Sequence, residues 1–206
     1  MAQMGRPRTF DRDVAVQQAM HLFWEHGYES TSLTLLKANI GSGITAPSFY
    51  AAFGSKEKLF REVVDRYVAT HGQVNAGLWD ESLSPRQAIE LALRRSAKMQ
   101  TERNHPKGCL LVLSASTCSS ENDHVQKLLA KQRARTRDGF QKCVQRAVDL
   151  GELPTNTDVR AFAASLHSFL LGLSMQARDG VPGAVLDAAV TEVMRNWDAH
   201  IASAGA

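Results

Sequence analysis

The sequence predicts an all-α protein of nine helices. Apolar residues recur at spacings of three and four along the 206-residue chain, and no segment shows the apolar–polar alternation of a strand. The residues at the ends of the expected elements are also typical of helices, because Ser, Thr or Asp stands where helices would begin and Gly where they would end. We find no internal repeat of solenoid length.

Three short helices are expected before residue 55, each with a polar residue at its start and a glycine at its end. The start and end residues are, in order, Asp11 with Gly27, Ser32 or Thr31 with Gly41, and Thr45 with Gly54. Pro47 falls in the first turn of the third helix, where a missing N–H costs little. Tyr28 is expected to fold back onto the first helix after Gly27.

Six further helices follow. Ser55 caps a fourth helix that runs to the region of Leu78, and Ser84-Pro85-Arg86-Gln87 is a capping box that begins a fifth, which ends near Arg103. The last four are expected at about 108–115, 122–150, 158–178 and 182–202.

The domain boundary is expected within the fourth helix. The predicted parts are a basic arm at 1–9, a small three-helix domain at 10–54, and a larger bundle at 55–206 whose first helix, 55–79, links the two domains.

Composition excludes several classes of protein. The chain is 44% hydrophobic and 22% charged, as globular domains are, and residues 161–177, its longest uncharged stretch in the second half, are too few and too polar to span a membrane. The first ten residues lack an apolar signal core, so we expect a cytoplasmic protein. Three cysteines without a Cys-x-x-Cys pair exclude a disulfide framework. Enzyme motifs such as Gly-x-Ser-x-Gly and His-Glu-x-x-His are absent from the sequence, which predicts a non-enzyme.

The positions of the charged residues say more about possible partners than the net charge does. The net charge of +3 does not by itself demand a nucleic-acid partner. Residues 127–146 hold seven basic side chains against one acid, and we interpret this run as the solvated face of a long helix.

The three short helices are typical of a helix-turn-helix, because a glycine-containing turn joins the second to a third that begins with small polar residues. Phe49 and Phe53 lie four residues apart and would anchor the third helix on the first two. Thr45, Ser48 and Tyr50 would then face outward, where hydroxyl groups meet phosphates and base edges.

These residues carry a resemblance to a known family. Phe23-x-x-x-Gly27-Tyr28-x-x-Thr31-Ser32, followed by Pro47-Ser48-Phe49-Tyr50-Ala51-Ala52-Phe53-Gly54-Ser55-Lys56-Glu57-x-Leu59-Phe60, resembles the DNA-binding domain of TetR/AcrR-type transcriptional repressors. The resemblance covers about residues 10–67 and implies a TetR-like nine-helix architecture with a larger ligand-binding and dimerisation domain. The DNA contacts that it implies are Ser32, Thr34, Thr45, Ala46, Pro47, Ser48, Tyr50 and Lys56.

Two further features bear on DNA binding. Arg6 and Arg8 belong either to an arm that enters an A·T-rich minor groove or to a solubilising tail. The segment Ile40-Gly41-Ser42-Gly43-Ile44 is about two residues longer than in the family, which lengthens either the turn or the second helix.

The second half is expected to form a homodimer. The helices at about 158–179 and 182–202 carry more apolar surface than one small bundle covers, and a four-helix interface with a second copy would cover it. Such a dimer suits a palindromic operator whose half-sites lie ~34 Å apart.

The sensing site is the least determined part. Candidate ligand or sensor residues, which core packing explains equally well, are Trp79, Met99, Cys109, Leu113, Cys118, Phe140 and His167. Cys109 follows Lys107 at a helix start, and both features favour a thiolate. The seven histidines show no ligand spacing, so no metal is expected.

The sequence therefore predicts a ligand-responsive repressor that binds operator DNA as a dimer and is released by a small-molecule effector, with no cofactor. Two alternatives stay open. One is a thiol-based redox or electrophile sensor of the same fold, and the other is an interaction module that keeps the fold without specific DNA binding, as the long turn would allow.

Overall fold

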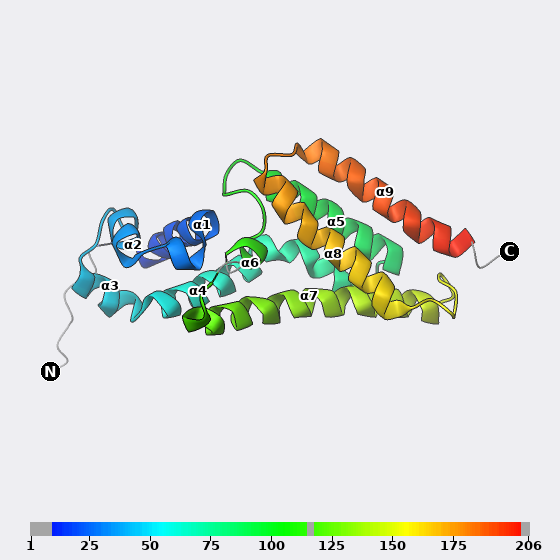
Figure 1. The fold of residues 1–206 in the computed structure, drawn as a ribbon, viewed down its shortest axis with the longest axis horizontal. Coiled ribbons are helices and arrows are strands. Elements are labelled where there is room, and N and C mark those ends of the chain that lie inside the picture. Colours follow the sequence, from blue (N-terminus) through cyan, green and yellow to red (C-terminus); the bar gives the residue numbers. More distant parts are fainter. Residues whose placement is uncertain (1–9, 115–117, 203–206) are drawn as a thin grey trace.

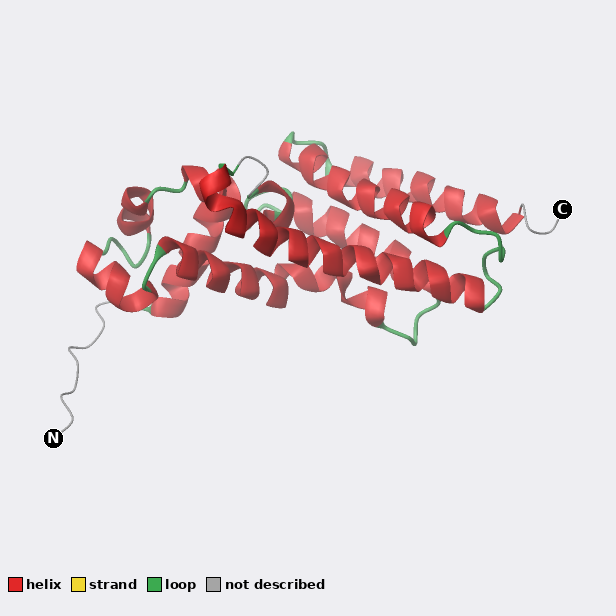
Figure 2. Cartoon of the chain, turned by 60° about the horizontal axis from the view of Figure 1, so that its bottom comes forward, coloured by secondary structure: helices red, strands yellow, loops and turns green. Residues whose placement is uncertain are grey.

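The computed structural model describes residues 10–114 and 118–202, and over these ranges its secondary structure is entirely helical (Figure 1, Figure 2). The expected all-α fold is thus confirmed for the described chain. Its α-helices are α1 Arg12–Ser30, α2 Leu33–Asn39, α3 Ala46–Phe53, α4 Lys56–Ala69, α5 Pro85–Thr101, α6 Leu110–Leu113, α7 Asp123–Asp149, α8 Val159–Arg178 and α9 Gly183–Ala202, with two 3-10 helices, η1 His71–Trp79 and η2 Ser120–Asn122.

Helix starts follow the predicted caps. Asp11 accepts the backbone N–H groups of Asp13 and Val14, and Thr45 accepts that of Ser48. Ser84 and Gln87 form the expected reciprocal capping box at α5. Because capping is a local interaction, these starts were visible in the sequence.

The end of α1 is shaped by Gly27, whose φ of +79° interrupts the helix. Tyr28 then folds back as expected and stacks on Phe23, with ring centroids 6.0 Å apart. A Cβ at position 27 would lie 3.4 Å from the carbonyl oxygen of Ser114, so the backbone there runs close to the α6 segment.

The long turn between α2 and α3 is a lengthened turn and not a lengthened helix, because α2 ends at Asn39. Gly41, Ser42 and Gly43 all have positive φ, at 57°, 62° and 91°. The turn is fastened to α1, since the Gly41 N–H donates to Oε1 of Gln18 at 2.8 Å. Residues 40–44 therefore lie outside α2, in a turn that is hydrogen-bonded to α1.

The predicted single helix at 55–79 is wrong, because α4 ends at Ala69 and η1 begins at His71. Thr70 leaves helical angles, at φ −119° and ψ −90°, and its hydroxyl donates to the carbonyl of Arg66 at 2.8 Å. The break allows η1 to pack against α5. That tertiary contact is not encoded in the helical spacing that suggested one continuous element.

The described chain has two apolar cores. The first joins α1–α4, with Phe23, Phe49 and Phe60 fully buried, and extends into the second half through buried residues of α5, α6 and α7. The second joins α5, α7, α8 and α9 around Phe140 and Trp197. Figure 1 shows α1–α3 gathered at one end, with α4 leading from them toward the bundle of α5, α7, α8 and α9.

The described helices include none that is long and apolar enough to cross a membrane.

Replacing Gly108 by alanine is expected to lower the free energy of unfolding by about 2–4 kcal/mol. Its φ is +82°, and the added Cβ would meet Cδ1 of Leu113 at 2.5 Å and the carbonyl oxygen of Ser174 at 2.8 Å. Gly151→Ala is the matched control, since its φ is +75° but nothing lies within 4 Å. That control should lose about 1 kcal/mol in the same denaturant titration. Equal losses in the two variants would contradict the crowding at Gly108.

Candidate functional site

The outer face of α3 is the first candidate surface. Phe49 and Phe53 are buried in the N-terminal core, as expected, and hold the helix in place. Thr45 and Pro47 are exposed, and Tyr50 is 50% exposed. The face thus offers a compact ridge of small side chains and one phenol to a partner.

This face is uncharged. The α3 sequence Ala-Pro-Ser-Phe-Tyr-Ala-Ala-Phe contains no Arg, Lys, Asn or Gln, the residues that read guanine or adenine through paired hydrogen bonds. The hydroxyls of Thr45 and Ser48 lie 2.9 Å apart, and Ala46 is half-buried beside them. Recognition through α3 would therefore use hydroxyl groups, the phenol and methyl contacts with thymine.

The other predicted contacts flank α3. Ser32 and Thr34 are exposed at the start of α2, where the Ser32 hydroxyl accepts the Leu35 N–H at 3.0 Å. Arg6 and Arg8 lie outside the described residues.

The ammonium group of Lys56 is less available to a phosphate than the sequence predicted, because it already has contacts within the protein. Its ammonium lies 4.3 Å from the centroid of the Tyr28 ring and donates to the Glu29 carbonyl at 3.4 Å. Burial lowers the pKa of Lys56, and the nearby Glu29 carboxylate opposes that shift. Lys58, which is not among the predicted DNA contacts, is an exposed cation whose side chain lies against Gly54 at the end of α3.

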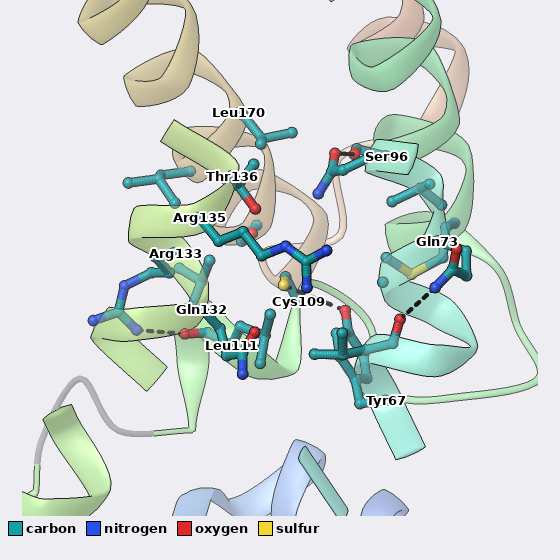
Figure 3. Close-up of a pocket in the computed structure, with 18 of the residues that line it drawn as sticks. Tyr67, Gln73, Ser96, Cys109, Leu111, Gln132, Arg133, Arg135, Thr136 and Leu170 are labelled. Carbon is teal, nitrogen blue, oxygen red and sulfur yellow. Dashed lines mark hydrogen bonds between the residues drawn. The ribbon is translucent and has the colours of Figure 1, made fainter. Parts of the chain in front are cut away.

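The larger half contains a cavity of about 270 Å³ between α4, η1, α5, α6, α7 and α8 (Figure 3). Four of the seven sequence candidates line it: Trp79, Met99, Cys109 and His167.

The other three candidates do not line the cavity. Phe140 is fully buried in the second core, and Cys118 packs against the first. Leu113 lies over Gly108. Helical spacing placed these residues on inward faces without showing which neighbours they meet.

Buried polar groups also line the cavity, and two of them, on Gln100 and Ser174, were not among the sequence candidates. Oε1 of Gln100, Nε2 of His167 and Oγ of Ser174 are buried, and none has a hydrogen-bond partner in the described structure. Arg133 and Arg135 line the cavity from α7. The basic run was interpreted as a solvated face, and Arg133 departs from that interpretation because it is half-buried.

The pKa of Cys109 is shifted in the direction opposite to the one that the sequence predicted. Burial raises the pKa of the Cys109 thiol, although the Tyr67 hydroxyl donates to Sγ at 3.3 Å and stabilises the thiolate. Proximity to a helix start and to Lys107 predicted the opposite direction, because neither feature shows how deeply the sulfur is enclosed.

The segment from 108 to 114 touches both the cavity and the small domain. The Tyr28 N–H donates to the Ser114 carbonyl at 2.9 Å, and Nε1 of Trp24 donates to the Gly108 carbonyl at 3.2 Å. Cys109, Leu111 and Val112 line the cavity between these two attachments. A ligand in the cavity would thus contact the segment that holds the end of α1.

Among the described residues, no group of three or more His, Cys, Asp or Glu side chains is arranged to hold a metal ion.

Comparison with known proteins gives consistent matches over both halves. The family model described as bacterial regulatory proteins, tetR family, matches residues 15–63, and that described as tetracyclin repressor-like, C-terminal domain, matches residues 86–180. The chain is 34% identical over 195 residues to the HTH-type transcriptional repressor ComR of Escherichia coli (strain K12), covering 94% of this chain and 91% of ComR. It is 29% identical over 179 residues to the HTH-type transcriptional regulator YezE of Bacillus subtilis (strain 168), covering 85% of this chain and 90% of YezE.

A solved structure extends the comparison to the fold. A cysteine mutant of the TetR family transcriptional regulator CifR, complexed with 26bp double-strand operator DNA, is similar with a TM-score of 0.85 and 40% identity. The match covers 93% of this chain and 100% of the CifR chain.

Tyr50→Ala is expected to weaken binding to a specific duplex by about tenfold or more, because it removes the largest exposed group of α3. Thermal stability should change little, since the ring is half exposed.

Lys56→Ala should lower both stability and DNA affinity, because it also removes the contact with the Tyr28 ring, worth about 0.5–2 kcal/mol. Fluorescence anisotropy and thermal unfolding measure the two effects.

Tyr50→Phe removes the phenol hydroxyl and keeps the ring, so the same assay measures the contribution of the hydroxyl alone. Unchanged DNA affinity in Tyr50→Ala would refute the assignment of this face.

Proposed function

Because this chain belongs to the tetR family of bacterial regulatory proteins, we propose that it represses transcription by binding a palindromic operator as a dimer and that a small effector releases it. We also propose a cytoplasmic location, because the proposed operator DNA lies there. The observation that carries the proposal is the outward, uncharged face of α3, held on a buried core beside two further exposed hydroxyl residues of α2. A CifR structure that resembles this chain closely contains operator DNA.

The exposed faces of α8 and α9 support the proposed dimer. On α8, Ala164, Ser168 and Gly172 are exposed at intervals of four, and nothing lies within 4 Å of a Cβ built at Gly172. Met175 and Val185 are each 54% exposed near the facing ends of α8 and α9. Small side chains at helical spacing allow two copies to approach closely, and the exposed apolar groups gain from being covered.

The proposed release mechanism uses α4 and α6. Tyr67 and Val68 of α4 line the cavity together with Leu111 of α6, and α4 continues directly from α3 through Gly54 and Ser55. An effector that shifts these walls changes the orientation of the small domain within each protomer. In a dimer that change moves the two α3 helices out of register with the half-sites.

A second candidate function is a thiol-based sensor, which the position of Cys109 in the cavity wall favours. An electrophile that entered the cavity would meet Sγ directly. The raised pKa of Cys109 makes the thiol less reactive than an exposed one, so reversible effector binding is our first proposal. A mass shift confined to Cys109 after exposure to an electrophile, with loss of DNA binding, would favour the second.

Specific DNA binding tests the main proposal. We expect the protein to bind the duplex that flanks its own gene about 10³-fold or more tightly than random DNA of equal length, with an affinity that falls as salt rises. Fluorescence anisotropy over a salt series measures both quantities. Equal binding of specific and random DNA by a stable dimer would instead support an interaction module.

Effector action has a reciprocal consequence. A compound that lowers operator affinity must itself bind less tightly, by the same factor, when operator is present. Titrating the compound against free and operator-bound protein measures the two affinities, and equal values would refute the release mechanism.

Gly172→Arg is expected to dissociate the dimer, because a long charged side chain would fill the open space on the α8 face. Sedimentation velocity should show a monomer, with helix content unchanged by circular dichroism. Gln145→Arg on the exposed side of α7 is the matched control and should stay dimeric. A dimeric Gly172→Arg protein would place the interface elsewhere.

A further inference from the structure

The Arg, Lys, Asp and Glu side chains among the described residues that line the cavity are all positively charged. Two arginines, Arg133 and Arg135, line the cavity, and none of the described residues that line it is Asp or Glu. Elsewhere the described arginines often pair with acids: Arg86 and Arg94 share Glu90, and Arg12 pairs with Glu62. The cavity is therefore a place where positive charge has been left without a counter-charge from the protein.

Arg133 shows this most clearly. Its guanidinium turns to the Leu111 carbonyl, as the dashed line in Figure 3 marks, and is half-buried. Burial lowers the pKa of Arg133, and among the described residues no carboxylate contributes to offset that effect. A partly desolvated cation that has only a neutral carbonyl as its partner is stabilised when an anion binds beside it.

Arg135 adds the second cation. It lies two residues after Arg133 on α7 and is exposed, with its guanidinium 5.4 Å from the centroid of the Trp79 ring, which is also part of the cavity wall. Figure 3 shows the Arg135 side chain extending across the cavity toward the side where Cys109 lies. An arginine placed in this way can offer two parallel N–H groups to a carboxylate.

The remaining polar groups suit an oxyanion as well. Ser174 and His167 are buried in the cavity wall, and neither Oγ of Ser174 nor Nε2 of His167 has a partner in the described structure. Burial lowers the pKa of His167, and the charges of Arg137 and Arg133 lower it further, so both effects favour the neutral ring. A hydroxyl and a neutral imidazole each have an N–H or O–H to donate to a carboxylate oxygen.

The rest of the wall is apolar. Met99, Val112, Leu170 and Leu171 face the same space. At about 270 Å³ the cavity exceeds the ~150 Å³ that holds one benzene ring. A ligand with an aromatic ring or a short alkyl chain therefore fits beside its charged group.

From these observations we infer that the cavity selects small organic carboxylates, with the carboxylate bound at the arginines of α7 that line it and an apolar body against α5 and α8. The inference rests on the proposed function in taking this cavity as the effector site. It goes beyond that function in naming the chemical class of the effector.

Matched acid and amide pairs test the inference, because each pair has one shape and differs in charge. The ligands are phenylacetate with phenylacetamide and hexanoate with hexanamide, titrated into the full-length protein by isothermal titration calorimetry. We expect at least one acid to bind about tenfold or more tightly than its amide. That acid should also weaken binding to operator DNA.

Variants assign the effect to residues. Arg133→Gln and Arg135→Gln are each expected to weaken binding of the acid about fivefold or more and to leave the amide within about twofold. Lys142→Gln is the matched control, because Lys142 is exposed on the same helix and does not line the cavity. If loss of the hydrogen bond to the Leu111 carbonyl prevents Arg133→Gln from folding, Arg135→Gln still tests the inference.

Three outcomes would overturn the inference. They are equal affinity for acid and amide in both pairs, no binding of either acid at about 10 mM, and an equal loss of affinity in Lys142→Gln, which would indicate a long-range field. Operator binding is measured separately by anisotropy. Failure of the acid preference with operator binding intact refutes this inference alone, whereas acid binding without any operator binding refutes the proposed function.

Discussion

The arrangement of the two halves depends on a few buried hydrogen bonds between the end of α1 and residues 108–114. Ser114 accepts the Tyr28 N–H at 2.9 Å and donates its hydroxyl to the Phe23 carbonyl at 3.1 Å, while Trp24 donates to Gly108 at 3.2 Å. Trp24 and Ser114 are 1% and 3% exposed, so water cannot replace a broken bond, and each unpaired group would cost about 1–3 kcal/mol. The segment that borders the cavity therefore moves together with α1 or not at all.

Much of the fold could be predicted because its signals are local. A cap such as Asp11 or Thr45 acts within one turn, so residue type and position alone were sufficient to locate α1 and α3. The family resemblance rested on the same region. Where a side chain or a break depends on distant contacts, sequence reasoning failed: the break at Thr70 takes effect through packing of η1 on α5, and Phe140 meets its neighbours only in the second core.

The cavity could be predicted only in part for the same reason. Trp79, Met99, Cys109 and His167 come from four different elements, and nothing in their spacing shows that they meet. Arg133 was hidden within a run of basic residues, most of which are indeed exposed. A single inward position in a charged helix becomes visible only once the neighbours on α6 are placed.

Lys56 connects the DNA-facing surface to the junction between the domains. Its ammonium contacts the Tyr28 ring and the Glu29 carbonyl. The carboxylate of Glu29 in turn accepts hydrogen bonds from the Ser119 hydroxyl at 2.9 Å and from the side chain of Asn122 at 2.8 Å. These groups follow α6 in the chain, so displacement of this region alters the contacts that hold Lys56. With no charge on α3 itself, we expect the cations that flank it to determine how strongly the phosphates of the proposed operator are held. A change at the junction would therefore act on phosphate contacts and not only on the spacing of the half-sites.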